Sequence, residues 1–166
     1  MAQRIGKYKV SDRDSALSLV DGGDVGGTIS VAGAATFSST VNATTGIQSA
    51  AVARTATDDG TGDGTIADGT TFVTVDADSD ANHIIILPTP TPGNVVYLSE
   101  SGTTGYELRS STPASVAING GTHATGESAI AGTITYVKCV CVSATSWICS
   151  QYDADGDESK VEAAAN

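Results

Sequence analysis

Three cysteines carry the most reactive side chains of this 166-residue chain, and they lie close together at Cys139, Cys141 and Cys149. A Cys-x-Cys spacing lacks the two-residue gap of zinc knuckles, and no second pair follows it, so these residues do not predict a metal site. The first 20 residues contain no continuous apolar run of the kind found in secretory signals. With an odd number of cysteines as well, we expect reduced thiols.

The cysteines lie on two runs that predict a β-hairpin with its turn at residues 143–146. Such a turn pairs Val142 with Trp147 and places Cys149 on the sheet face opposite the other two cysteines. We therefore expect no disulfide and interpret all three thiols as small buried hydrophobic groups. Trp147 and Tyr152 are interpreted as core or subunit-interface residues, with a sugar-stacking platform as the alternative.

Two acidic runs, residues 76–80 and 153–158, space their carboxylates like the opening of a calcium loop. An EF-hand loop requires glycine at its sixth position and glutamate at its twelfth. Glu158 and Ala164 occupy these positions in the second run, and the first run fails in the same way. We interpret both runs as solvated acidic loops, and a weak calcium site joining two loops is the alternative.

Other candidate catalytic residues show no recognisable motif. His83 and His123 lie far apart, and the serine-rich stretches contain no Gly-x-Ser-x-Gly nucleophile elbow. Glu100, Glu107 and Glu127 could supply a glycosidase carboxylate pair, but their spacing is typical of ordinary surface acids. The sequence therefore predicts no enzyme, no catalytic residue, no metal ligand and no cofactor.

The elements that position these residues are short strands separated by turns. Seven strands are expected between residues 65 and 152, and they are residues 71–75, 83–87, 94–98, 106–109, 115–118, 133–142 and 146–152. Turns every 8–12 residues favour an antiparallel β-sandwich or a jelly-roll-like barrel. The chain is thus predicted to be mainly β.

Four segments are expected along the chain. Residues 1–56 are predicted to form an extended N-terminal arm, with one short helix at about 12–20 and short strands within 27–48. A Gly- and Asp-rich linker at 57–64 is expected to join the arm to the β domain of residues 65–152. Residues 153–166 are expected to form an acidic tail, as an exposed coil or a short helix.

A thin apolar row runs through the arm at Ile29, Val31, Phe37 and Val41. The neighbours of these residues are small or hydroxylated, so the row cannot close a core by itself, because an isolated two-stranded unit is marginal in water. We expect the row to pack against another subunit. That need for a partner is the main functional indication in the sequence.

Charge is distributed unevenly along the chain. The net charge is −11, yet four of the eight basic residues lie within the first 13 positions. The acidic body argues against nucleic-acid binding, which depends on neutralising phosphates, and no apolar run is long enough for a membrane span. We expect the arm to contact an acidic protein partner through Arg4, Lys7, Tyr8, Lys9 and Arg13, with a solvated terminus as the alternative.

The run from Gly27 to Gly46, rich in Thr, Ser, Ala and Gly, resembles segments common in tailed-phage virion proteins. These include capsid decoration (cement) proteins and the fibres of heads and tails. The stretch from Tyr106–Ser111 through Cys139–Thr145 is also similar to C-terminal domains of small phage structural proteins. The resemblance implies a homotrimer on the virion surface, made in the host cytoplasm, and carries over no catalytic motif.

This resemblance implies a capsid decoration protein that trimerises and clamps neighbouring subunits of the major capsid protein. The alternative is a receptor- or glycan-binding piece of a head fibre or tail fibre.

Overall fold

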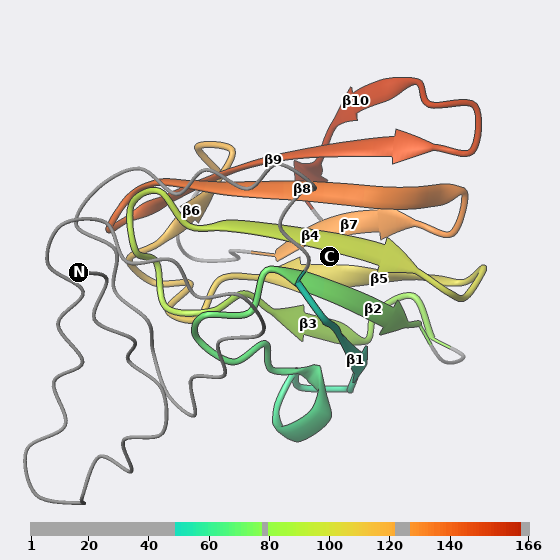
Figure 1. Ribbon diagram of the computed structural model, residues 1–166, viewed down its shortest axis with the longest axis horizontal. Coiled ribbons are helices and arrows are strands. Elements are labelled where there is room, and N and C mark those ends of the chain that lie inside the picture. Colours follow the sequence, from blue (N-terminus) through green and yellow to red (C-terminus); the bar gives the residue numbers. More distant parts are fainter. Residues whose placement is uncertain (1–48, 78–79, 122–126, 164–166) are drawn as a thin grey trace, which may run out of the picture. The chain divides into compact units, whose positions relative to one another are not determined.

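Two β-sheets packed face to face form the part of the chain that the structure, a computed structural model, describes: residues 49–77, 80–121 and 127–163. In Figure 1 the large sheet faces the viewer, and β3, β5 and β7 of the small sheet lie behind it. The strands of the large sheet are β1 (Ala51–Thr55), β2 (Phe72–Asp76), β4 (Val95–Glu100), β6 (Ala117–Ile118), β8 (Ile134–Ser143), β9 (Ser146–Asp153) and β10 (Glu158–Lys160). Those of the small sheet are β3 (Ile84–Ile86), β5 (Gly105–Arg109), β7 (Glu127–Ala131) and β11 (Glu162–Ala163).

The order of strands is β1-β2-β4-β8-β9-β10 in the large sheet, with β6 paired to β9, and β11-β7-β5-β3 in the small sheet. The mainly β prediction is confirmed, and the sheets are not closed into a barrel as the jelly-roll-like alternative required. The purely antiparallel prediction is also wrong, because β1–β2, β2–β4, β3–β5 and β6–β9 are parallel pairs.

Parallel pairing follows from the route of the chain. From β2 to β8 consecutive strands alternate between the two sheets, so the chain visits the small sheet between β2 and β4. Parallel neighbours require a crossover connection, which the visits to the other sheet supply for β2–β4 and β3–β5, whereas β5 and β7, also joined through the other sheet, pair antiparallel. Only the later β8–β9 and β9–β10 connections are hairpins within one sheet.

The core lies between the inner faces of the two sheets. On β8 the side chains of Val137, Cys139 and Cys141 are almost fully buried, and the intervening residues point outward, which is the two-residue period of a strand. Trp147 from the large sheet and Tyr106 from the small sheet are the largest fully buried side chains. Burying each large aliphatic side chain contributes about 1.5–3 kcal/mol, so this double layer holds the fold together.

The composition of residues 57–64 predicts a linker, but in the structure this segment covers the edge of β3. The N–H of Thr57 donates to the Ile84 carbonyl at 3.2 Å, and the Ile84 N–H donates back to Thr57 at 2.7 Å. Asp59 accepts hydrogen bonds from the backbone and hydroxyl of Thr61 at 2.9 and 2.7 Å. The segment includes a short 3₁₀ turn at Gly62–Gly64. The β domain therefore begins at β1 rather than near residue 65.

The predicted acidic tail also belongs to the sheets. β10 pairs with β9 of the large sheet, and β11 pairs with β7 of the small sheet. Val161, between them, is 1% exposed and packs into the core. The chain thus crosses from one sheet to the other here, and the expectation of a coil or short helix is wrong for the described residues up to 163.

All seven strands predicted between residues 65 and 152 are present, with boundaries that differ by up to two residues. The prediction missed β7 within that range, together with β1, β10 and β11 outside it. The predicted helix at 12–20 and the short strands of 27–48 lie outside the described residues.

Candidate binding surface

Three rows of side chains run across the strands on the outer face of the large sheet, which is the face turned toward the viewer in Figure 1. Each row follows from the pairing of β2, β4, β8 and β9, because directly opposite residues point to the same face. The rows are Phe72, Tyr97, Lys138 and Ser150; Thr74, Ser99, Tyr136 and Tyr152; and Val95, Val140 and Ile148. We call this surface the outer face.

Four aromatic rings cross the outer face in one continuous line. Phe72 and Tyr97 stack with ring centroids 4.8 Å apart and planes at 22°, and Tyr97 and Tyr136 stack at 5.9 Å and 19°. Tyr152 follows, tilted by 49°, with its centroid 5.5 Å from that of Tyr136. We call these residues the aromatic row. Because the rings stack on one another, the row offers ring edges more than broad ring faces to a partner.

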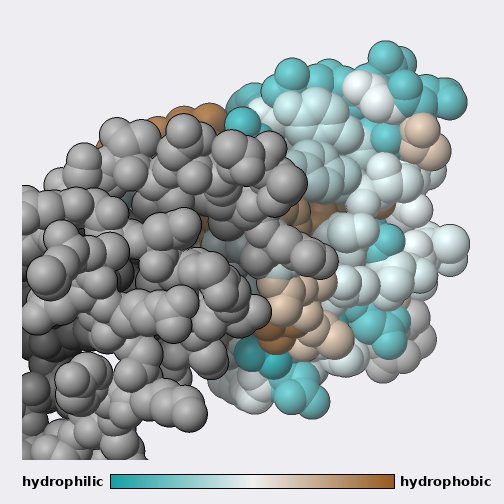
Figure 2. Space-filling model, viewed as in Figure 1, coloured by the Kyte–Doolittle hydropathy of each residue, from teal (hydrophilic) through white to brown (hydrophobic). Residues whose placement is uncertain are grey.

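Large apolar side chains are exposed on the outer face. Phe72, which belongs to the aromatic row, is 40% exposed, and the aliphatic Ile148 is 46% exposed. Val142, 53% exposed, lies where β8 approaches its turn. Figure 2, seen from this side, shows mostly pale, near-neutral residues over the described strands, with strongly hydrophilic residues gathered around the turn between β9 and β10. The middle of the outer face is therefore weakly hydrated compared with its rim.

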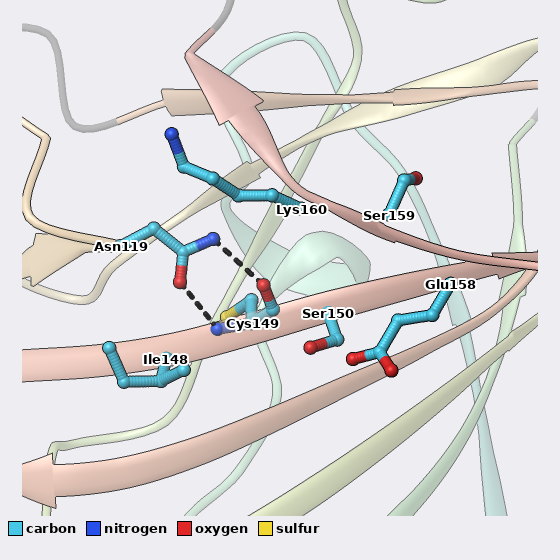
Figure 3. A pocket seen from close by; sticks show the side chains of 7 residues that line it. All are labelled: Asn119, Ile148, Cys149, Ser150, Glu158, Ser159 and Lys160. Carbon is cyan, nitrogen blue, oxygen red and sulfur yellow. Dashed lines mark hydrogen bonds between the residues drawn. The ribbon is translucent and has the colours of Figure 1, made fainter.

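A shallow groove of about 490 Å³ lies between β9 and β10 (Figure 3). Seven residues line it: Asn119, Ile148, Cys149, Ser150, Glu158, Ser159 and Lys160. The groove thus places the cationic Lys160 and the anionic Glu158 near the exposed Ile148. A second, smaller groove of about 240 Å³ is lined by residues 69–71 and 93–95.

Asn119 fixes one wall of the larger groove. Its backbone N–H donates to the Trp147 carbonyl at 2.9 Å, which extends the β6–β9 pairing by one bond. Its side chain then accepts from the Cys149 N–H at 2.7 Å and donates to the Cys149 carbonyl at 2.8 Å (Figure 3). The same amide donates to the Val161 carbonyl at 3.1 Å. Asn119 therefore replaces a missing strand residue and joins β9 to the segment between β10 and β11.

Asn119 also has a left-handed backbone, with φ of 52°. Asparagine tolerates this conformation better than most residues with a side chain. Both its backbone and its amide thus suit this position.

Two phenols of the aromatic row, those of Tyr136 and Tyr152, have raised pKa values. Burial raises the pKa of Tyr136 above its ordinary value of 10.0, and the neighbouring phenols of Tyr97 and Tyr152 add to that rise. Burial and the adjacent Glu158 carboxylate raise the pKa of Tyr152 in the same direction. These two phenols therefore stay neutral at neutral pH and can be covered by a partner without removing a phenolate charge from water.

The acidic runs do not assemble a calcium site in the described residues. The Asp153 carboxylate accepts the backbone N–H groups of Asp155 and Asp157 at 3.0 and 2.9 Å, and so holds the turn between β9 and β10. Among residues 49–77, 80–121 and 127–163, no three His, Cys, Asp or Glu side chains gather where they could hold a metal ion. Asp78 of the first run lies outside these residues.

The three glutamates considered as a carboxylate pair are divided between the sheets. Glu100 ends β4 of the large sheet and accepts the Gly105 N–H at 3.0 Å. Glu107 and Glu127 lie on β5 and β7 of the small sheet, where Glu127 forms an ion pair with Arg109. None of the three glutamates lines either groove. His83 immediately precedes β3, and His123 lies outside the described residues.

All three cysteines are buried and unpaired in the structure, as expected, but their predicted register is wrong. Cys149 lies opposite Cys139, and Trp147 lies opposite Cys141. A β-bulge between Cys141 and Ser143 shifts the pairing by one residue, which places Cys149 on the same face as the other two cysteines.

The residues predicted to contact a capsid partner, Arg4, Lys7, Tyr8, Lys9 and Arg13, lie outside the described residues. So do those predicted to pack between subunits, Ile29, Val31, Phe37 and Val41. Both assignments stay predictions. The outer face was missed by the sequence analysis, although Tyr152 had been singled out.

No protein-family model, curated protein or solved structure matches this chain. In the described segments, no helix has the length and apolar character needed to cross a membrane.

Proposed function

We propose that this protein is a capsid decoration protein of a tailed phage, which trimerises on the capsid surface and clamps neighbouring major capsid subunits. The resemblance of residues 27–46 to virion proteins suggests this class. The observation that carries the proposal furthest is the outer face, because it combines a rigid aromatic row with large aliphatic side chains that are about half exposed.

Such a surface favours a protein partner. Covering an exposed apolar side chain contributes about 25 cal/mol for each Å² removed from water. Each aromatic ring lies against at least one neighbouring ring, stacked or tilted, so little side-chain freedom remains to be lost on contact. The acidic turn of residues 153–158 borders this face and suits a partner with basic groups at the corresponding rim.

The test is co-sedimentation of the purified protein with capsids of the phage that encodes it, after removal of the decoration layer. Ile148→Lys places a charge on the outer face, at the β9 end of the Val95, Val140 and Ile148 row, and should weaken capsid binding at least about tenfold, or about 1.4 kcal/mol. Ala129→Lys is the matched control, because Ala129 is an exposed strand residue of the small sheet. Equal binding by both variants and the parent would contradict the assignment of the outer face.

The oligomeric state is a separate part of the proposal. Light scattering should give three times the chain mass of 16.6 kDa. A folded monomer at micromolar concentration would rule out the trimer.

The aromatic row also supports the alternative of a glycan-binding fibre piece. Its phenols lie beside Lys138, Ser150 and Ser99, which are hydrogen-bonding groups suited to sugar hydroxyls. The stacking of the rings on one another argues against a flat sugar platform, so we place this function second. Electron microscopy of virions distinguishes the two, since decoration gives a lattice of surface knobs and fibres give a few projections.

A further inference from the structure

The Cys139 and Cys149 thiols face each other across the β8–β9 hairpin, inside the core. The two residues are directly paired in the antiparallel register and are 0% and 2% exposed. Both side chains point into the sandwich. Neither thiol belongs to the outer face that we assign to partner binding.

The backbone at this pair has the narrow spacing of an antiparallel ladder. Both the N–H and the carbonyl of Cys149 bond the Asn119 side chain (Figure 3), so they point away from β8. On β8, the Cys141 N–H donates to Asn94 at 2.9 Å, and Cys139, two residues earlier, likewise turns its backbone groups toward β4. Cys139 and Cys149 are thus a non-hydrogen-bonded pair, whose Cα atoms lie about 4.5 Å apart in such ladders. That separation falls within the range of about 4.4–6.8 Å found in disulfides.

Cys141 is buried to the same degree but has a different environment. It lies opposite Trp147, and its thiol donates to the Ser143 carbonyl at 3.1 Å. Cys141 and Cys149 are diagonal rather than directly opposite, and diagonal neighbours in a ladder lie about 7–8 Å apart, beyond the range of about 4.4–6.8 Å found in disulfides. Cys139 and Cys149 are therefore well placed for a disulfide, and Cys141 serves as a control cysteine in the same hairpin.

We propose that Cys139 and Cys149 form a cross-strand disulfide when the hairpin folds in the presence of a low-molecular-weight disulfide, such as oxidised glutathione. One cysteine thiolate attacks the small disulfide, breaks its S–S bond and releases one small thiolate. The second cysteine thiolate then attacks the mixed disulfide and releases the other. The two electrons pass to the small disulfide, and the two thiol protons end on the two released thiols.

We expect the disulfide to form while the chain is folding, before the two thiols are buried. The two thiols are almost fully covered, and burial raises the pKa of Cys139, so the reactive thiolate is scarce in the native state. The Asn119 side chain also bonds both backbone groups of Cys149. Once formed, the bond would tie together two adjacent strands of the large sheet.

The experiment is to unfold the reduced protein in concentrated urea and dilute it into native buffer that contains oxidised and reduced glutathione. Remaining thiols are then alkylated, and the disulfides are assigned by peptide mass mapping. Under native conditions the Cys139–Cys149 bond should exceed the Cys141–Cys149 bond by at least about tenfold, or about 1.4 kcal/mol. In urea with the same redox buffer, the two bonds should form in similar amounts because their loops differ by only two residues.

Two variants complete the test. Cys141→Ser should still form the disulfide, lose two hydrogens in mass and unfold at a higher urea concentration than its reduced form. Cys149→Ser should form no intramolecular bond in the folded state. Predominance of the Cys141–Cys149 bond, or refolded protein with native circular dichroism and no internal disulfide, would overturn the proposal.

Discussion

Replacing Asn119 tests the hydrogen bonds that hold β6, β9 and the end of the chain together. Its side chain makes three bonds to backbone groups, two at Cys149 and one at Val161. Asn119→Ala removes all three and leaves an alanine at a φ of 52°. Asn119→Gly removes the same bonds but relieves the backbone, because glycine adopts left-handed conformations without a steric penalty.

The expected losses can be estimated from these contacts. A hydrogen bond contributes about 0.5–1.5 kcal/mol net, and a buried backbone group left without a partner costs about 1–3 kcal/mol. Together the lost bonds should lower the free energy of unfolding by about 2–3 kcal/mol in Asn119→Gly. The left-handed backbone adds about 1–2 kcal/mol in Asn119→Ala. Either loss is large beside the total stability of about 5–15 kcal/mol that is usual for a protein domain.

Urea unfolding followed by tryptophan fluorescence measures these losses, since Trp147 is buried next to the site. We expect the midpoint urea concentration to be highest for the parent, lower for Asn119→Gly and lowest for Asn119→Ala. Asn119→Asp keeps an acceptor for the Cys149 N–H but places an anion near two carbonyl oxygens, so it should be no more stable than the glycine variant. A glycine variant as stable as the parent would refute the role given to the amide.

Two further predictions concern the aromatic row and a buried carboxylate. Tyr97 stacks on both Phe72 and Tyr136, and each aromatic pair contributes about 0.5–1.5 kcal/mol. Tyr97→Leu should therefore lower the free energy of unfolding by about 1–3 kcal/mol, and Phe72→Leu should lower it by about half as much. Equal losses in urea unfolding would show that the stacking contributes nothing. Burial raises the pKa of Glu100 above its ordinary value of 4.5, so the folded state keeps this proton to higher pH than the unfolded chain does. The contribution of Glu100 to the free energy of unfolding therefore falls as the pH rises from the pKa of the unfolded chain to that of the folded state. Glu100→Gln keeps an acceptor for the Gly105 N–H and should unfold at a higher urea concentration than the parent at pH 7, with a difference that narrows below about pH 4.5; a constant difference from pH 3 to pH 7 would contradict this reasoning.

The strands with strong local signals could be predicted from the sequence. The aliphatic run of residues 84–87, which contains β3, is continuous and is followed by Pro88. The β8–β9 hairpin has two long β-branched and aromatic runs around a polar turn. By contrast, β7 has only Ile130 as a large apolar side chain, and β10 consists of three exposed polar residues. Such strands are stabilised by their partners, which the local sequence does not identify.

The order of strands could not be predicted for the same reason. Phe72, Tyr97 and Tyr136 each alternate with buried valines or leucines along their own strands, so their outward orientation follows from the sequence. Their meeting in one row depends on β2, β4 and β8 being neighbours, although β3 lies between β2 and β4 in the chain and belongs to the other sheet. The outer face is therefore a product of the crossovers, and no motif marks it.

The register of the hairpin is the error with the most consequence, and the side chains contained the information to correct it. The predicted turn pairing is right at Ser143 and Ser146, but the bulge shifts the pairs from Cys141–Trp147 to Tyr136–Tyr152 by one residue. Apolar residues occupy both phases of β8, so periodicity alone cannot reveal a bulge. Polarity can: Lys138 must face solvent, which turns Cys139 inward, and the polar Ser150 likewise turns Cys149 inward. Two inward cysteines cannot coexist with the unshifted register, so assigning each strand's polar face first would have predicted both the bulge and the facing thiols.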